Sequence, residues 1–263
     1  MIGFLIKKTF FDLWDNLFRV ALVNLGFIAS LALPVFVPGL LIAVPALSLA
    51  VTLIGVLWCC VYLSAAALSI KALSDYGSFG FGDFFRNLKE GIPAGIFMCF
   101  FVFIIFVMFT VVMPFYLDMG SLVGLFLAAV IFWTMAAAVF SFQFFFAVRS
   151  RLEGNILKSA KKCFLIFFDN PGLAVFSLVH NVVILALSLF LALLFPGPGG
   201  ILLYLDEALR LRLLKYDWLD ANPVENPAGP ARKRKVPWDE ILIDERERTG
   251  TRSFKSFIFP WKD

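Results

Sequence analysis

Near the carboxyl end of the chain, four charged residues interrupt an apolar stretch: Asp206, Glu207, Arg210 and Arg212. Residues three or four positions apart lie on one face of a helix, so Arg210 can pair with Asp206 or with Glu207. Paired charges inside a helical bundle could line a polar cavity, and we expect the two arginines to neutralise the two acids. The alternative is that all four lie at a membrane edge, where water partly hydrates them.

His180 and Asn181 form a second candidate site, because they lie well inside another apolar run. An ionisable group within a membrane is costly, so a functional role is its default interpretation. A neutral histidine bonded to a neighbouring helix is the structural alternative. One histidine without a nearby acid or thiol pair is no metal site. We find no catalytic or cofactor-binding motif elsewhere, so the sequence predicts neither an enzyme nor a bound metal or cofactor.

Long apolar runs must position these residues. Of the 263 residues, 61% are hydrophobic and only 16% are charged, and a soluble domain has too little interior for that composition. A helix of about 20 apolar residues crosses the hydrocarbon layer of a bilayer. The run that carries the four charges is the least clear of six candidate spans: 20–37, 39–70, 92–114, 121–148, 171–195 and 199–218. The second run is longer than a span needs, so we expect it to be tilted or to have a kink near Pro45.

Lysines and arginines occupy alternate connections between these runs, which is typical of a polytopic membrane protein. The connections near Pro34–Pro38, Pro114–Gly120 and Pro196–Gly200 carry no basic residue. Because basic residues are retained on the cytoplasmic side, the pattern predicts an all-α transmembrane bundle of six spans with both termini in the cytoplasm. The basic tail falls on that side only if 199–218 is counted as a span.

Two regions are expected to flank a transmembrane domain of residues 20–218. Residues 1–19 suit an amphipathic helix in the inner interface with its lysines toward the lipid headgroups, although the first span could simply start early. Residues 219–263 follow proline-containing breaks and are too short for a core, so we expect a cytoplasmic tail, extended or docked. The lipid bilayer is therefore the expected partner. Basic groups that flank apolar spans do not suit nucleic acid.

Three segments that precede spans share an aromatic residue two positions before an asparagine. The pairs are Trp14 and Asn16, Phe85 and Asn87, and Phe168 and Asn170. Each is followed by an apolar helix, an outer turn and a return helix, which predicts three repeated helical hairpins that pack against one another. The asparagines could cap helices and the aromatic rings could anchor the interface. Chance recurrence of a short motif is the alternative.

The segments Gly80–Lys89, Leu13–Leu17 and Asn170-Pro171 together resemble the YesL-like family of bacterial membrane proteins. The resemblance covers roughly residues 10–215 and not the tail. It implies a polytopic helical protein of the bacterial inner membrane whose activity is not established. It also implies an accessory role near a carbohydrate transporter, and it carries over no catalytic residues.

Two functions remain open from the sequence. An accessory or scaffold component, associated with solute uptake or with another membrane protein, fits spans that are apolar apart from His180, Asn181 and the sixth segment. The alternative is a small-molecule transporter in its own right, with a pathway between the hairpin repeats. A transporter should have broken helices and polar groups that converge near the midplane, so the scarcity of polar residues favours the scaffold.

Overall fold

The computed structural model describes residues 1–152, 154–223, 236–250 and 252, and no strand occurs among them. The fold is all-helical, as predicted. A short π-helical turn, η1 (Met108–Val112), joins two of the helices into one continuous rod. The helices in chain order are α1 (Ile2–Asp15), α2 (Leu17–Leu40), α3 (Pro45–Ser74), α4 (Phe81–Val107), α5 (Met113–Asp118), α6 (Leu122–Phe142), α7 (Phe145–Arg151), α8 (Ile156–Asp169), α9 (Pro171–Phe190), α10 (Gly197–Ala221), α11 (Trp238–Ile241) and α12 (Ile243–Thr249).

Within the described residues, five helical stretches are long and apolar enough to cross a membrane: Leu17–Leu40, Pro45–Ser74, Phe81–Asp118, Leu122–Arg151 and Pro171–Phe190. They confirm the five clearer runs of the sequence. The predicted sixth span corresponds to α10, which is not among them, because its charged residues lower its apolar character. The expected kink near Pro45 is wrong. That proline is the first residue of α3, where its missing N–H removes no helical hydrogen bond.

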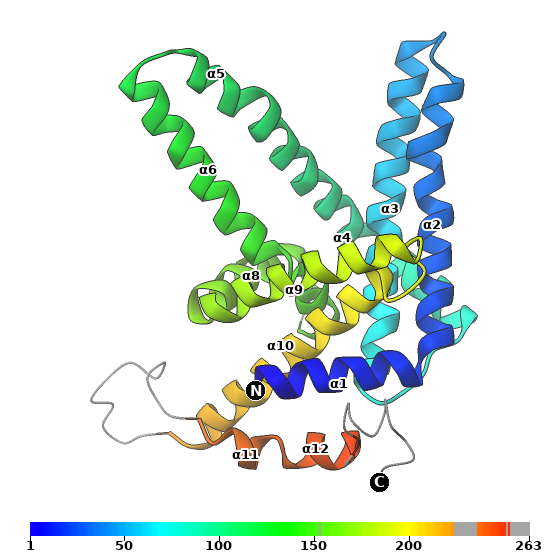
Figure 1. The fold of residues 1–263 in the computed structure, drawn as a ribbon, viewed down its shortest axis with the longest axis vertical. Helices are drawn as coiled ribbons and strands as arrows, with labels where there is room; N and C mark the ends of the chain where they lie inside the picture. The colour runs from blue at the N-terminus through cyan, green and yellow to red at the C-terminus, as the bar shows by residue number, and fades with distance from the viewer. Residues whose placement is uncertain (153, 224–235, 251, 253–263) are drawn as a thin grey trace.

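Two long hairpins dominate the fold: α2 with α3, and the rod α4–η1–α5 with α6 (Figure 1). They pack together near α1 and lean apart at the other end. Close packing of α3 on α4 needs glycine, because a Cβ on Gly95 would lie 2.5 Å from the Cα of Val61. We call the separated outer portions, residues 31–54 and 100–133, the two arms.

The third hairpin, α9 with α10, is shorter than the sequence predicts. α9 runs across the molecule at a steep angle to α2 and α3, and the chain reverses beside the middle of α2 (Figure 1). Asn24 of α2 donates to the carbonyls of Leu194 (3.0 Å) and Pro196 (2.8 Å) and accepts from the N–H of Gly199 (2.7 Å). Since α2 continues to Leu40, this turn stops about 24 Å short of its far end. The Pro196–Gly200 connection, expected as an outer turn, therefore packs inside the molecule.

The core lies in the half of the molecule that holds α1, which we call the base. α10 is its central helix and contacts α1, α2, α3, α7 and α9. Leu203, Tyr204 and Leu209 of α10 are completely buried. α11 and α12 also lie at the base, where Leu242 between them is completely buried (Figure 1). The tail is thus docked as far as α12, while the basic run 232–235 and the aromatic residues 257–261 lie outside the described residues.

Candidate functional site: a buried charge network

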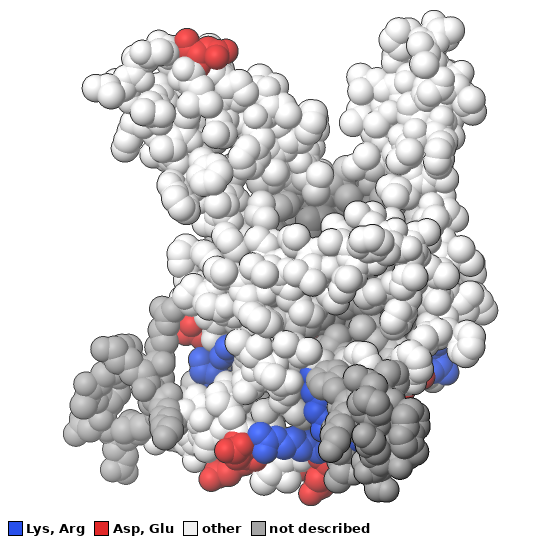
Figure 2. Space-filling model, viewed as in Figure 1, with Lys and Arg blue, Asp and Glu red and all other residues white. Residues whose placement is uncertain are grey.

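Charged residues gather at the base. On the face drawn in Figure 2, the lysines and arginines lie at this end, and the apolar surface above them carries an acidic group only at the tip of one arm. α5 ends at that tip with Asp118. The base contains several ionisable side chains that are nevertheless buried, and these form the candidate site.

Lys8 of α1 is completely buried and faces two acids. Its Nζ lies 3.2 Å from Oε1 of Glu207 in α10 and also pairs with the carboxylate of Asp12, one turn further along α1. Thr9 donates its hydroxyl to the other Glu207 oxygen. Burial by itself would lower the pKa of Lys8, but the carboxylates of Glu207 and Asp12 outweigh burial and raise that pKa above its usual value. The expectation that the lysines of residues 1–19 point toward headgroups is therefore wrong for Lys8.

Arg151, at the end of α7, joins α10 to the end of α3. Its Nε donates to Oδ1 of Asp206 at 2.9 Å, and its Nη2 pairs with the other oxygen of that carboxylate. Its Nη1 lies 3.0 Å from Oδ1 of Asp75, and its Nη2 donates to the Ser74 hydroxyl at 2.8 Å. A planar guanidinium suits such bidentate recognition of a carboxylate. One arginine thus fixes the ends of α3 and α7 against α10.

Arg210 connects the tail to the same cluster. Its Nε and Nη2 donate to Oε1 of Glu245 in α12, at 3.0 and 2.6 Å, and its Nη1 pairs with Asp75. The hydroxyl of Tyr76 donates to the other Glu245 oxygen at 2.7 Å. Nζ of Lys8 lies 4.3 Å from the centre of the Tyr76 ring, within reach of a cation–π interaction. The docked tail is therefore part of the site.

We call these residues the basal charge network: Lys8, Asp12, Asp75, Arg151, Asp206, Glu207, Arg210 and Glu245. The pairs within α10 that helical spacing predicts are wrong, because Asp206 pairs with Arg151 and Glu207 with Lys8. The alternative prediction, that water hydrates these two acids at a membrane edge, is also wrong, since Asp206 is 2% exposed and Glu207 0%. Each carboxylate is turned toward a cation from another element, so the pairs fill space and do not line an open cavity.

Arg212 stays outside the network. Its guanidinium lies 5.7 Å from the centre of the Trp238 ring in α11. Its Nε is buried and has no hydrogen-bond partner among the described residues. Burial lowers the pKa of Arg212 from its usual value, although arginine stays protonated. This arginine therefore helps to dock the tail through an aromatic ring and does not neutralise an acid of α10.

His180 and Asn181 do not join the charge network. The His180 ring stacks on Tyr204 with ring centres 3.9 Å apart, and its Nδ1 lies 3.5 Å from Oδ1 of Asn181. The Tyr204 hydroxyl is 3.2 Å from that of Ser177. Within the described residues, neither His180 nor Asn181 contacts a charged side chain of α10. This geometry fits the structural alternative, a histidine that holds α9 against α10.

The three asparagines of the repeat pattern have two different settings. Asn16 separates α1 from α2, and Asn170 separates α8 from α9. Each donates its side-chain amide to the carbonyl four residues earlier, at 3.0 and 3.4 Å. Asn87 instead lies inside α4 and donates to the hydroxyl of Ser69 in α3 at 2.9 Å. The aromatic residues that precede them are all exposed: Trp14, Phe85 and Phe168.

Sequence reasoning missed Asp12, Asp75, Arg151 and Glu245, and it assigned Lys8 to the lipid interface. The pairs of the network that connect different elements join residues between 35 and 199 positions apart, separations that no local pattern reveals. The only local signal was the four-residue spacing of Lys8 and Asp12, which favours a pair on one helix face.

The basal charge network fits a structural role better than a reactive one, because its acids are paired with lysine or arginine. No protein-family model, no curated protein and no solved structure matches the chain. The proposed function therefore rests on the geometry of the base and of the arms.

Proposed function

We propose that the protein is an accessory or scaffold component of the bacterial cytoplasmic membrane, which binds another membrane protein through its two arms. In the part of the chain that the structure describes, five helical stretches are long and apolar enough to cross a membrane, which supports an integral, multi-pass membrane protein. In agreement with its resemblance to the YesL-like family, we place the partner among solute-uptake systems, and among carbohydrate transporters in particular. An enzymatic role is not part of the proposal.

One observation carries this proposal: within the described residues, each arm packs only within its own hairpin and leaves most of its apolar surface uncovered. The most apolar window of Phe81–Asp118 has no buried residue. The arms lean apart, and Figure 2 shows open space between them on this face. Large apolar side chains are exposed along both: Leu49, Leu53, Phe103, Phe106, Phe126 and Trp133. Lipid can cover such surfaces, but two separated hairpins on a fixed base also offer apolar faces to the helices of a second protein.

The proposed orientation puts the base, with α1 and α12, on the cytoplasmic side, as the positions of lysine and arginine suggest. The turns at 41–44 and 119–121 then face outward. The turn between α9 and α10 then ends within the membrane, so α9, although long and apolar enough to cross, forms a shortened third hairpin with α10 and does not cross. α1 and α12 still lie on the same side.

The alternative, a transporter in its own right, has less support. A pathway between the hairpins should be lined by convergent polar groups. Within the described residues, the charged side chains buried most deeply are paired in the basal charge network, and the outer arms are apolar. Asn24, a buried polar residue in the first half of α2, has its side-chain amide fully hydrogen-bonded to the turn before α10.

Photo-crosslinking in intact membranes tests the scaffold proposal. A photoreactive amino acid at Leu53 in one arm and at Phe106 in the other should yield an adduct to the same membrane protein. Phe18, an exposed apolar residue at the base, is the matched control and should not yield that adduct. Adducts to lipid alone, or only to a second copy of this chain, would contradict the proposal. Substrate uptake by proteoliposomes that hold only this protein would establish the transporter instead.

A further inference from the structure

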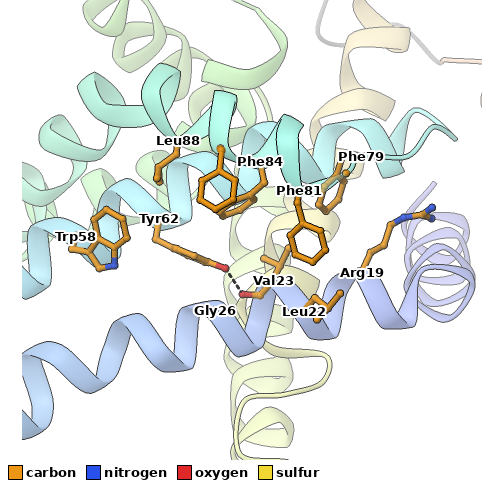
Figure 3. Close-up of a pocket in the computed structure, with 12 residues that line it drawn as sticks. Arg19, Leu22, Val23, Gly26, Trp58, Tyr62, Phe79, Phe81, Phe84 and Leu88 are labelled. Atoms are coloured by element: carbon orange, nitrogen blue, oxygen red, sulfur yellow. Dashed lines mark hydrogen bonds between the residues drawn. The ribbon is translucent and has the colours of Figure 1, made fainter.

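A groove of about 490 Å³ lies where α2, α3 and the first turns of α4 meet, apart from both the arms and the basal charge network. Figure 3 shows aromatic rings from α3 and α4 turned toward it, with α2 along the other side. Trp58 and Tyr62 of α3 and Phe81 and Phe84 of α4 contribute these rings. The volume falls within the range of about 300–1,000 Å³ that is usual for small-molecule sites.

The rings of Trp58, Tyr62, Phe81 and Phe84 form an aromatic wall. Its polar atoms already form hydrogen bonds within the protein. The Tyr62 hydroxyl donates to the carbonyl of Val23 at 2.8 Å, which is the dashed line in Figure 3. The indole N–H of Trp58 donates to the hydroxyl of Ser30 at 3.0 Å. What remains toward the groove is ring and alkyl surface. Such a wall favours a hydrocarbon chain and offers no free hydrogen-bonding group to a polar solute.

One end of the groove is cationic. Among the described residues, Arg19, near the start of α2, is the only charged one that lines the groove, and its side chain lies at the end of the group of sticks in Figure 3. Nη1 of Arg19 donates to Oδ1 of Asn16 at 3.0 Å, and Arg19 makes no ion pair with any described residue. Two acids near this end are already paired with other arginines. Oδ1 of Asp15 lies 2.9 Å from Nη1 of Arg252, and Oδ1 of Asp83 lies 3.0 Å from Nη2 of Arg86. An uncompensated positive charge therefore lies at this end.

We propose that this groove binds a phospholipid with an anionic headgroup, with an acyl chain against Trp58, Tyr62 and Phe84 and the headgroup phosphate beside Arg19. The positive charge of Arg19 favours a ligand with an anionic headgroup. Because Arg19 lies where the charged base meets the apolar part of α2, a ligand there can keep its charge in the headgroup layer and its chain in hydrocarbon. This site is independent of the partner that we propose for the arms.

Native mass spectrometry of the full-length protein in a mild detergent tests the site. The protein is offered equal amounts of phosphatidylglycerol and phosphatidylcholine with identical acyl chains. We expect the first bound lipid to be phosphatidylglycerol in excess by about fivefold, the usual contribution of one basic residue near an anionic headgroup. Arg19→Ala should abolish that excess. Lys89→Ala, which removes an exposed cation on α4 outside the groove, should leave it unchanged.

A second pair of variants tests the groove itself. Leu22→Trp places an indole in the groove and should lower the first-lipid occupancy of both lipids by about fivefold or more. Leu25→Trp, on the same helix but outside the groove, should bind both as the parent protein does. The proposal is overturned if Arg19→Ala prefers phosphatidylglycerol over phosphatidylcholine as strongly as Lys89→Ala does. It is also overturned if Leu22→Trp and Leu25→Trp bind lipid equally.

Discussion

At the base, charged side chains from α1, α7, α10 and α12 are buried together, whereas in the arms large apolar side chains are exposed on helices that lean apart. The difference reverses the arrangement of a soluble protein, which exposes charge and buries apolar groups. In lipid the hydrophobic effect does not drive helices together, so apolar arms have little reason to close. Specific pairing of ions, hydrogen bonds and close glycine contacts can still fix the base.

This contrast assigns different tasks to the two regions. The basal charge network ties distant parts of the chain to one arrangement, and removing one member would leave another charge buried without compensation. Among the described residues, no comparable set of polar contacts fixes the arrangement of the arms. If the contrast is correct, stability should depend on polar residues at the base and should be almost insensitive to apolar residues of the arms.

The largest effect is expected for Lys8→Met. The change leaves Asp12 and Glu207 facing each other without their shared cation, and stranding buried charge in this way costs about 3–5 kcal/mol. We expect a sharply lower melting temperature in detergent. Adding Glu207→Gln should recover part of the loss, because one of the stranded charges is then removed.

Arg86→Met is the matched control for Lys8→Met. Arg86 pairs with Asp83, but its side chain is 75% exposed, and surface pairs contribute at most about 1 kcal/mol. Equal melting temperatures for the Lys8 and Arg86 variants would show that the buried network is not what holds the base together.

A smaller loss is expected for Asn24→Ala, which removes the side chain that holds the turn before α10. The carbonyls of Leu194 and Pro196 and the N–H of Gly199 would lose their partner, at a cost of about 3 kcal/mol in all. Thermal unfolding in detergent measures the loss. Thr134→Ala is the control, because Thr134 is exposed and bonds only within its own helix, to the carbonyl of Val130. A variant at Asn24 as stable as the Thr134 variant would mean that the turn does not depend on this clamp.

The smallest effect is expected in the arms. Phe106 is 62% exposed, so Phe106→Ala should change stability in detergent by no more than about 0.5 kcal/mol. The same substitution at Phe144, which is 0% exposed in the base, should cost about 3–5 kcal/mol. The two melting temperatures compare arm and base directly. A large loss of stability for Phe106→Ala would show that this arm is packed against other parts of the protein, and would contradict the difference between arm and base.

The apolar runs predict the long helices well, because about 20 apolar residues at a stretch have few uses besides crossing a membrane. Their ends are less predictable. Pro34 and Pro38 suggest a connection, yet both lie inside α2, and the turn follows only after Leu40. Likewise, Asn16 and Asn170 mark true junctions between helices, whereas the equivalent Asn87 lies inside α4. A short motif does not distinguish these settings.

The candidate site was predictable only in part. The charges of α10 stand out in an apolar stretch, but the sequence left burial of Asp206 and Glu207 open against hydration at a membrane edge. Their partners do not, because Lys8 and Arg151 come from elements whose placement depends on the whole fold. The shortened third hairpin was equally hidden: nothing near Pro196 in the sequence shows that Asn24 would bind this turn.

The central claim is that the arms cross the bilayer while the α9–α10 turn ends inside it. Spin labels on single cysteines at Met119 in an arm tip and at Leu191 before the turn measure this, after Cys59, Cys60, Cys99 and Cys163 are replaced by alanine. Both positions are exposed on the protein, 52% and 55%, so both labels point away from it. In lipid vesicles, a water-soluble relaxation agent should reach the label at Met119, and only dissolved oxygen should reach the label at Leu191. Equal access of the water-soluble agent to both labels would mean a full-length third hairpin and would contradict the account.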